Sequence, residues 1–333
     1  MRDIVIAGFD GALATAITGL VDIFSLTGVS WARMTQQAPK REFRVLLASE
    51  DGHHVRCLNG LTLKAHCRFD YLVSQTQLSP APYAIIVPTI GGKILDTLQN
   101  NQALCALLRW GHSQGSIIAG NCTGNFFLAE AGLLKHRSAT THWGYKSLFE
   151  ERYPEVDLRI NQMITAQDNI YCAGGGLAWF DLCIHLIEAE LGYQTAIETA
   201  RAFVIDYRRD NQLSYSLQDI AQQHQDTLLG EIQHFMRKNL HQRIELDALA
   251  QQFNLSQRTL IRRFQQAIGM SPKQYLQALR IEAAQKLIAE TDLSTEAIVQ
   301  SVGYEDSSSF RRLFKARTGS TLKEYRQRFA RRI

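Results

Sequence analysis

The chain has 333 residues, of which 45% are hydrophobic, and its formal net charge at pH 7 is +4. A chain of this length exceeds a typical single domain and predicts two globular domains, each with a core of ordinary size. It contains no run of 18 or more apolar residues, which argues against a membrane-spanning helix, and residues 3–9 are expected to form a strand rather than a signal peptide.

All six cysteines lie between Cys57 and Cys183, without a C-x-x-C pair. This usage is typical of a reduced, cytoplasmic protein. Three histidines lie near two of these cysteines, but their spacing fits no metal-binding template; the residues are His53, His54, Cys57, His66 and Cys67. We expect a solvated hairpin in this stretch, and no metal or other cofactor in the protein.

Over the first two-thirds of the chain, short apolar runs alternate with helical patterns. The predicted strands are residues 4–9, 43–48, 83–88, 116–120 and 170–173, and the predicted helices are residues 12–26, 94–112, 122–134, 177–191 and 193–208. Such alternation is typical of an α/β fold with a doubly wound, mostly parallel sheet that helices cover on both faces. We expect one domain over residues 1–208, a linker over residues 209–224 and a second domain over residues 225–333.

The fourth predicted strand turns sharply, through small residues, into the helix that begins at Cys122. Such an elbow places the cysteine at the carboxyl edge of the sheet and at a helix N-terminus. Ligand sites collect at this edge in open α/β folds, and a helix N-terminus lowers the pKa of a thiol. A ligand site at Cys122 is therefore expected; the alternative is a buried structural cysteine in a tight junction.

Three segments carry a resemblance to a known family: Cys122-Thr123-Gly124, residues 128–134 (LAEAGLL) and residues 139–143 (ATTHW). With them, the N-terminal domain resembles the PfpI/ThiJ-like domains of the class-I glutamine amidotransferase-like fold, which is flavodoxin-like. Hydrolytic members of that family pair the elbow cysteine with a histidine, commonly the next residue, and with an acid from the first helix. Here Thr123 and Ala16 stand at those positions. The resemblance therefore implies a pocket that binds a ligand, with no catalytic residue.

A receptor of this kind has an expected ligand preference. Main-chain N–H groups at Thr123 and in the Gly91-Gly92 turn are expected to cradle a carboxylate, although an ordinary turn explains the glycine pair equally well. An indole beside an acid suits a cation such as an amine. The side chains expected to meet the ligand are Asp10, Cys122, His142 and Trp143. The expected effector is an amino acid or a related nitrogen compound.

Towards the C-terminus one pattern occurs twice: a short helix, a tight turn and a second helix with several arginines. The first copy covers residues 249–275 and the second covers residues 298–325. Three pairs of residues repeat at a separation of 50 positions, namely Phe264 and Phe314, Gly269 and Gly319, and Tyr275 and Tyr325. This duplication predicts two helix-turn-helix units.

The first arginine-rich helix has the features of a recognition helix. Ser256 is its expected N-cap, at the point where the helix would enter a major groove. Leu260 and Phe264 define its buried face; the opposite face carries Gln257, Arg258, Thr259, Arg262 and Arg263. Arginine can hold a guanine edge bidentately or clamp a phosphate. One copy alone fits an amphipathic helix with a solvated basic face equally well, whereas two copies favour a DNA-reading domain.

The C-terminal segment is basic, whereas the rest of the chain is slightly acidic. Residues 225–333 hold 18 Lys/Arg and 11 Asp/Glu, against 18 and 21 in residues 1–224. Within residues 307–333 there are nine basic residues and a single acidic one, Glu324. We expect this segment to lie along a polyanion, with phosphate contacts supplying affinity and a few side chains supplying sequence choice.

Residues 225–333 resemble the DNA-binding domain of the AraC/XylS family. The first copy matches the family pattern S-x-R-x-L-x-R-x-F, and the second departs from the family at Val299, Tyr304 and Leu322, where alanine, phenylalanine and proline are usual. The resemblance implies two recognition helices, held by a linker helix over residues 273–290, in successive major grooves about 34 Å apart. By position, the base-reading side chains are Arg258, Arg262, Ser308, Ser309 and Arg312, and the phosphate-binding ones are Arg263, Arg311, Lys315 and Arg317.

Together the two resemblances point to the GlxA-like transcription regulators. They imply a cytoplasmic homodimer that binds double-stranded DNA under the control of a small molecule, contacts RNA polymerase and activates transcription. Two alternatives stay open, and both use Cys122. One is a cysteine-dependent hydrolase or hydratase with an attached DNA-binding domain, in which His142 assists; the other is a thiol redox-sensing regulator.

Overall fold

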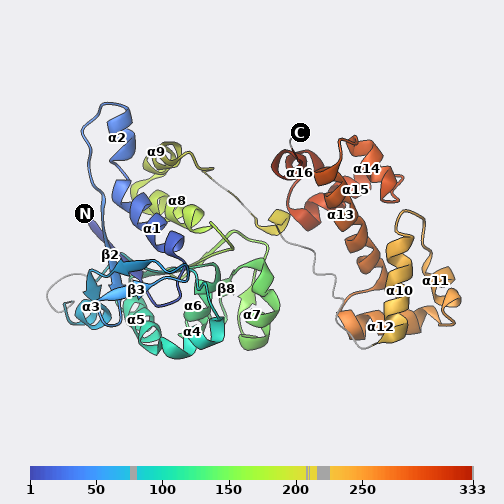
Figure 1. The fold of residues 1–333 in the computed structure, drawn as a ribbon, viewed down its shortest axis with the longest axis horizontal. Coiled ribbons are helices and arrows are strands. Elements are labelled where there is room, and N and C mark those ends of the chain that lie inside the picture. The colour runs from blue at the N-terminus through green and yellow to red at the C-terminus, as the bar shows by residue number, and fades with distance from the viewer. Residues whose placement is uncertain (76–80, 208, 210, 216–225, 332–333) are drawn as a thin grey trace. The chain divides into compact units, whose positions relative to one another are not determined.

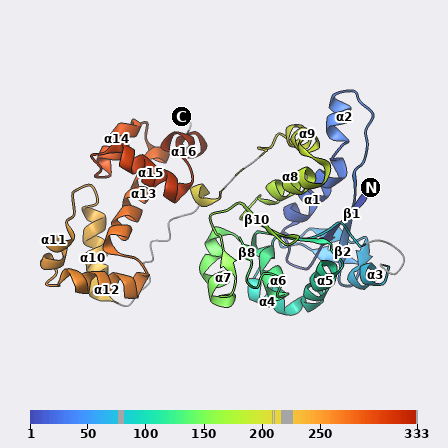
Figure 2. The same cartoon turned by 180° about the vertical axis from the view of Figure 1, so that it is seen from behind.

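The computed structural model describes residues 1–75, 81–207, 209, 211–215 and 226–331. The chain divides into two compact units, Met1–Gln212 and Leu213–Ile333, each described separately below (Figures 1 and 2). Of the expected linker, residues 210 and 216–224 lie outside the described residues, as does residue 208 at the expected end of the first domain. Gln212, which the sequence places in the linker, belongs to the first unit.

Among the described residues, the first unit contains a seven-stranded sheet with the order β10-β11-β7-β6-β1-β2-β5. Its strands are β1 Arg2–Ala7, β2 Phe43–Ser49, β5 Cys67–Arg68, β6 Ala84–Val87, β7 Ile117–Asn121, β10 Ile164–Gln167 and β11 Ile170–Ala173. All pairings in it are parallel except that of β10 with β11. The predicted doubly wound, mostly parallel sheet is therefore confirmed.

Helices cover both faces of this sheet (Figures 1 and 2). One layer contains α1 Ala14–Leu26, α8 Trp179–Leu191 and α9 Tyr193–Phe203, and the other contains α4 Ile94–Asn100, α5 Gln102–Ser113 and α6 Asn125–Glu130. Because both faces are covered, the side chains of Ile4, Val5 and Ile6 in β1 are all fully buried. In the first layer, a Cβ at Gly19 would lie 1.8 Å from the ring of Trp179, so α1 and α8 pack closely only because residue 19 is glycine.

The structure differs from the predicted elements in several places. The helix expected over residues 193–208 ends at Phe203, because Val204 has left-handed backbone (φ 55°). The helix expected over residues 94–112 is broken at Asn101, whose backbone is not helical (φ −128°, ψ 45°) and which separates α4 from α5. The helix expected over residues 122–134 begins with a 3₁₀ turn, Cys122–Gly124, and α6 ends at Glu130. Strands β5 and β10 were not predicted, because each is short and only its neighbours in the sheet stabilise it.

Smaller elements complete the unit: α2 Ser30–Met34, α3 Phe69–Gln75, α7 Lys146–Arg152, and the pairs β3 His54–Arg56 with β4 Thr62–Lys64 and β8 Ser138–Ala139 with β9 Asp157–Leu158. The antiparallel pair β3–β4 is the hairpin expected around His53. His66 is held by the sheet, because its Nδ1 accepts a hydrogen bond of 2.9 Å from the amide of Leu47. In the described part of the chain no three His, Cys, Asp or Glu side chains form a group suited to a metal.

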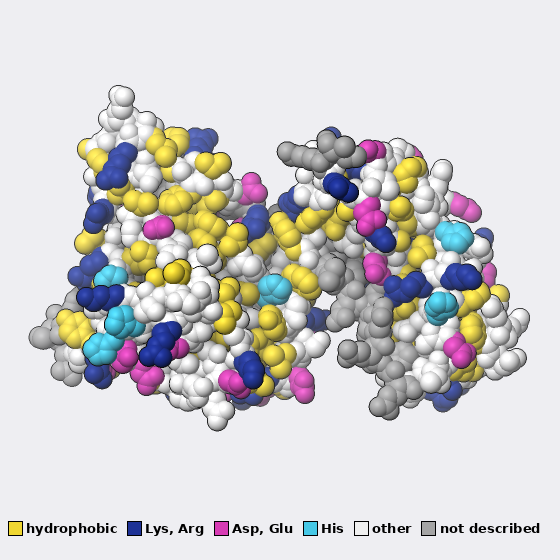
Figure 3. All heavy atoms as spheres, viewed as in Figure 1, with side chains coloured by type: hydrophobic (Ala, Val, Ile, Leu, Met, Phe, Trp, Pro, Cys, Tyr) yellow, Lys and Arg dark blue, Asp and Glu magenta, His cyan; other side chains and the backbone are white. Residues whose placement is uncertain are grey.

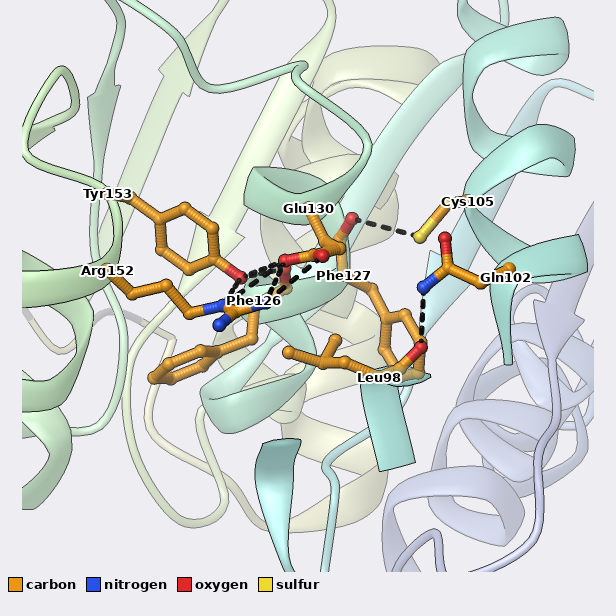
Figure 4. A network of polar contacts seen from close by, with 8 residues as sticks. All are labelled: Leu98, Gln102, Cys105, Phe126, Phe127, Glu130, Arg152 and Tyr153. Carbon is orange, nitrogen blue, oxygen red and sulfur yellow. Dashed lines mark hydrogen bonds and ion pairs between the residues drawn. The ribbon is translucent and has the colours of Figure 1, made fainter. Parts of the chain in front are cut away.

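A polar network fixes the helix that follows the elbow (Figure 4). The carboxylate of Glu130, at the end of α6, accepts hydrogen bonds from Nη2 of Arg152, the last residue of α7 (3.0 Å), and from the hydroxyl of Tyr153, the next residue (2.7 Å). Burial and the neighbouring carboxylate raise the pKa of Tyr153, so its hydroxyl stays protonated and donates. The end of α6 is thus attached to α7.

The second unit is helical. Its helices are α10 Thr227–Lys238, α11 Leu246–Gln252, α12 Gln257–Ile268, α13 Pro272–Glu290, α14 Thr295–Ser301, α15 Ser307–Thr318 and α16 Leu322–Phe329. Its buried apolar side chains form two separate clusters, one reaching from Leu229 to Leu279 and the other from Ile281 to Tyr325. Among the helices of the described residues, none is both long and apolar enough to cross a membrane.

Candidate nucleic-acid interface and ligand pocket

Helices α12 and α15 occupy equivalent places in the two copies of the repeat and have equivalent ends. The Ser256 hydroxyl caps α12 by accepting from the amide of Thr259 at 3.2 Å, as predicted. The Asp306 carboxylate caps α15 by accepting from the amides of Ser308 (2.9 Å) and Ser309 (3.1 Å). Both helices end at a glycine with left-handed backbone, Gly269 and Gly319 in the predicted repeat (φ 68° and 70°).

The repeat of 50 residues is also a repeat of packing. The ring of Phe264 lies 5.5 Å from that of Tyr275, and the ring of Phe314 lies 5.6 Å from that of Tyr325. The helix that follows each glycine begins with a capping box, Ser271 with Gln274 before α13 and Thr321 with Glu324 before α16. Leu322 stands where the family has proline, and α16 still begins there because the capping box is present.

Several polar side chains on α12 and α15 are exposed. On α12 these are Gln257, Arg258 and Arg262, while Thr259 and Arg263 are half-buried; on α15 they are Ser308, Ser309, Arg311, Arg312 and Lys315. Four of these basic side chains form no ion pair with another described residue, namely Arg258, Arg262, Arg312 and Lys315. Their charges are therefore available to a ligand. Leu260 and Phe264 are fully buried on the other face of α12. The assignment of these side chains to bases or phosphates remains a prediction.

Two of the arginines expected at phosphates have partners inside the unit. Arg263 Nη1 lies 2.7 Å from Oδ2 of Asp226, which also caps α10 through the amide of Leu229. Arg311 pairs with Glu296 of α14. A phosphate must compete with a carboxylate at each position. Elsewhere on this unit, on the face shown in Figure 3, basic and acidic side chains are interspersed.

In the first unit, Cys122 forms the predicted elbow between β7 and the 3₁₀ turn. Its φ is 58°, a left-handed conformation that few non-glycine residues adopt. The turn packs closely beneath β6, since a Cβ at Gly124 would lie 2.4 Å from the carbonyl oxygen of Pro88. The Thr141 hydroxyl donates to the carbonyl of Cys122 at 2.9 Å and ties the elbow to the segment before His142.

The prediction of a lowered thiol pKa at Cys122 was wrong. The side chain is buried, and this desolvation raises its pKa above the ordinary value. Hydrogen bonds from the amides of Gly176 and Thr123 and from the Thr89 hydroxyl favour the thiolate but do not outweigh burial. At neutral pH Cys122 is therefore a protonated thiol.

The expected carboxylate cradle needs a correction. The amide of Gly91 is already bonded to the carbonyl of Gly11 at 2.9 Å, so it cannot serve a ligand. The amide of Thr123 is directed at the sulfur of Cys122, together with that of Gly176. A Cβ at Gly92 would meet only one atom within 4 Å, at 3.9 Å, so the backbone there is open. The sequence did not identify Gly176, because strand β11 brings it to the elbow from a distant part of the chain.

Asp10 and Ala16 do not supply an acid to Cys122. The Asp10 carboxylate accepts a hydrogen bond of 2.9 Å from the amide of Arg56, and its side chain is 59% exposed. Ala16 is buried in α1. The other carboxylate oxygen of Asp10 lies 3.9 Å from Arg56 Nε, so this carboxylate is held by the hairpin β3–β4.

His142 is held as a neutral ring. Its Nδ1 accepts a hydrogen bond of 3.0 Å from the amide of Gly144, which places the ring proton on Nε2, and burial lowers its pKa. The ring packs against Trp143, with centroids 5.1 Å apart. It also packs against the backbone at Gly175, where a Cβ would lie 2.3 Å from the ring. His142 thus contacts the loop whose next residue, Gly176, donates to Cys122.

Gln212 also contacts this loop, a contact that no sequence pattern indicated. The side chain is buried and accepts a hydrogen bond of 2.9 Å from the amide of Gly175. Its Nε2 donates to the carbonyls of Thr141 (2.7 Å) and Ile160 (2.8 Å). A Cβ at Gly174 would lie 3.0 Å from its amide group. The last residue of the first unit is thus built into the wall that carries His142 and Gly176.

Comparison with known proteins adds two matches within the chain. Residues 20–189 match the DJ-1/PfpI family, and residues 249–328 match a helix-turn-helix domain. Over 318 residues the chain is 28% identical to the HTH-type transcriptional regulator GbdR of Pseudomonas aeruginosa, covering 92% of this chain and 83% of that protein. Over 220 residues it is 30% identical to the HTH-type transcriptional regulator CdhR of the same species, covering 65% and 64%.

Solved structures resemble the first unit. The crystal structure of Drosophila melanogaster DJ-1beta aligns with a TM-score of 0.51 and 16% identity, over 62% of this chain and 99% of its own. A putative transcriptional regulator protein from Vibrio parahaemolyticus aligns with a TM-score of 0.50 and 21% identity, over 60% of this chain and 97% of its own. These similarities concern the fold alone, and they confirm the predicted flavodoxin-like α/β architecture.

Proposed function

The chain belongs to the DJ-1/PfpI family and carries an AraC-type helix-turn-helix domain, and from this premise we propose that a small metabolite controls its binding to DNA. The chain is a DNA-binding transcription regulator, as are the relatives that match it over most of its length. We further propose that it acts in the cytoplasm as a homodimer, that it contacts RNA polymerase and that it activates transcription.

One observation carries the DNA side of the proposal. Helices α12 and α15 have capped starts, left-handed glycine ends and fully buried aromatic anchors. Each also exposes an arginine, Arg262 or Arg312, that forms no ion pair within the described part of the chain. A pair of equivalent helices on one linker helix suits two successive major grooves. Arg262 and Arg312, which repeat at a separation of 50 residues, are proposed to read bases.

The pocket at Cys122 is proposed to bind its ligand without chemistry. A cysteine nucleophile needs a thiolate or an adjacent base. Burial keeps the Cys122 thiol protonated, and the residue after it is Thr123. His142 offers no free base at Nδ1, because this atom accepts a hydrogen bond from the amide of Gly144. An amino acid or amine remains the proposed effector, with Trp143 and the open backbone at Gly92 among its contacts. These features do not favour the hydrolase or the redox-switch alternative.

Gln212 provides the proposed path by which the effector acts on the second unit. Its amide bonds to Thr141 and Gly175, the two segments that flank His142, and the chain leaves the first unit directly after it. A ligand changes an equilibrium only by binding one state more tightly than the other. A ligand that moves either segment changes how firmly Gln212 is held.

The test uses the full-length protein and a panel of amino acids and amines. A ligand that binds the folded protein raises its melting temperature, and the stabilisation grows with the logarithm of the ligand concentration divided by Kd. The active compound is then added to protein bound to a DNA duplex selected from a random library. The expected result is a change in DNA affinity with that compound. A panel without any thermal shift, or amide hydrolysis that Cys122→Ala abolishes, contradicts the receptor proposal while leaving DNA binding intact.

A further inference from the structure

Helix α13 runs through both halves of the second unit, and the two apolar clusters meet on it. Leu279 belongs to the cluster of the first half and Ile281 to the cluster of the second. The residue between them is Arg280, whose side chain is only 9% exposed. A buried arginine at the junction of two apolar clusters needs polar partners, because an unpaired buried charge is strongly unfavourable.

The partners of Arg280 come from both halves of the unit. Its Nε donates to the carbonyl of Leu240 at 2.8 Å, and its Nη2 donates to the carbonyl of Gln242 at 2.7 Å. Both carbonyls lie between α10 and α11, in the first half. The guanidinium also lies over the ring of Tyr304, 5.0 Å from its centroid, in the turn between α14 and α15. In the described part of the chain Arg280 forms no ion pair with a carboxylate.

The two halves approach closely at this point. A Cβ at Gly303 would lie 2.7 Å from the carbonyl oxygen of His241 and 2.8 Å from Arg280 Nη2, and φ of Gly303 is 79°. Only glycine therefore fits between the segment 240–242 and the guanidinium. Leu240 packs against both apolar clusters. Leu240, Arg280, Gly303 and Tyr304 thus form a joint at which the two halves contact each other.

A groove of about 750 Å³ borders the joint. Arg280, Gly303 and Tyr304 line it, and so do Gln257 from the first turn of α12 and Ser309 from the first turn of α15. Any rotation of one half against the other at the joint therefore changes the separation of the two recognition helices where they begin.

We propose that Arg280 is a positioning residue that fixes the spacing and mutual angle of α12 and α15, so that the protein accepts two half-sites at only one separation. The inference rests on the proposed reading of DNA by both helices. A planar guanidinium satisfies two carbonyls in fixed directions while its face stacks on a ring, and lysine cannot do all three. Its removal leaves two buried carbonyls unpaired and frees the joint.

The test measures half-site spacing with the full-length protein. The wild type first selects a duplex from a random library, and derivatives then carry one base pair more or less between the two half-sites. Each base pair shifts one half-site by about 3.4 Å and turns it by roughly a tenth of a turn. The wild type is expected to bind these derivatives at least about tenfold more weakly, because one helix loses its bases.

Arg280→Met is expected to bind the selected duplex more weakly but to bind all three spacings within about threefold of one another, since contacts of each helix remain. Its affinity for a duplex with one half-site randomised is expected to equal that of the wild type. Arg280→Lys and Tyr304→Leu each keep part of the joint. Their spacing selectivity is expected to lie between that of the wild type and that of Arg280→Met. Arg243→Met is the matched control, because Arg243 lines the same groove, its side chain is 85% exposed, and it pairs with Glu245, a neighbour in the chain.

The outcomes separate the two proposals. Retained spacing selectivity in folded Arg280→Met and Tyr304→Leu overturns the role of Arg280 while leaving DNA reading by both helices intact. Loss of single half-site binding in these variants, with a cooperative melting transition preserved, also overturns it. If Arg280→Met does not fold, Arg280→Lys and Tyr304→Leu decide the question on the same duplexes. A wild type that selects no two-part duplex refutes the proposed function, and this inference with it.

Discussion

Arg262 and Lys315 are exposed residues of α12 and α15 that carry the same charge but are expected to act differently on DNA. Arg262 is predicted to contact base edges, so Arg262→Ala should weaken specific binding by about 1–3 kcal/mol and relax the choice at one base pair. Lys315→Ala should weaken all sequences alike and reduce the dependence of affinity on salt, because it removes a phosphate contact. Anisotropy titrations against the selected and a random duplex, at several salt concentrations, check both. If Arg262→Ala loses the same affinity for both duplexes, the prediction that Arg262 contacts bases is wrong.

Cys122 is expected to react slowly despite its place at an elbow. Because burial raises the pKa of its thiol, the fraction present as thiolate is small at pH 7 and grows only as the pH rises above the ordinary range of cysteine, about 8.5. Alkylation of the folded protein by iodoacetamide, followed by mass spectrometry of the peptide that contains Cys122, measures this. The unfolded protein is the control. Fast alkylation at pH 6 would mean a lowered pKa and would favour the redox or enzyme alternative.

At the scale of the element, helix ends and interiors give opposite expectations for the same substitution. Gly269 ends α12 with φ 68° and Gly230 lies inside α10, and a Cβ at either would meet no atom within 4 Å. Gly269→Ala should destabilise the unit by about 1 kcal/mol through strain, whereas Gly230→Ala should stabilise it by about 0.5–1 kcal/mol through helix propensity. Calorimetry of the full chain checks the pair. A change in melting temperature of the same sign in both variants would show that packing, and not backbone conformation, determines their stability.

Elements were predictable where periodicity or repetition was strong. The helices around Phe264 and Phe314 were predictable because their sequence pattern occurs twice. Strand β1 was predictable from its continuous run of apolar residues. Strands β5 and β10 were missed because two to four residues show no usable period and their pairing depends on distant strands. The break at Asn101 was missed because the segments before and after it, α4 and α5, fit a single helical pattern.

The residues of the pocket were predictable only in part. The elbow at Cys122 follows from small residues after a strand, and the position of Thr123 and Gly124 follows with it. Its thiol pKa was misjudged, because sequence shows the helix N-terminus but not the burial. Gly176 and Gln212 reach the site from 54 and 90 positions away. Contacts over such separations have no local signal, so a polar glutamine read as a linker residue proved to be buried.

At the scale of the whole molecule, Gln212 offers a direct test of communication. Gln212→Leu removes three hydrogen bonds of the side-chain amide to Thr141, Ile160 and Gly175 and leaves buried carbonyls unpaired. We expect DNA affinity without effector to change and the response to effector to shrink, while the effector still binds. Thermal shift measures effector binding and anisotropy measures DNA affinity. Val204→Ala is the control, because the side chain of Val204 is 91% exposed and lies in the same unit as Gln212. An unaltered response in Gln212→Leu would show that the signal takes another route.

The separation of the second unit into two apolar clusters has a consequence for how such a protein changes over evolutionary time. Substitutions in sites without shared neighbours act independently, and among the described hydrophobic side chains only Leu240 packs against both clusters. Either copy of the repeat can therefore acquire new base preferences, or accept substitutions in its apolar cluster, without changing the packing of the other copy. Descendants of one ancestral duplication can thus come to recognise unrelated promoters one half at a time.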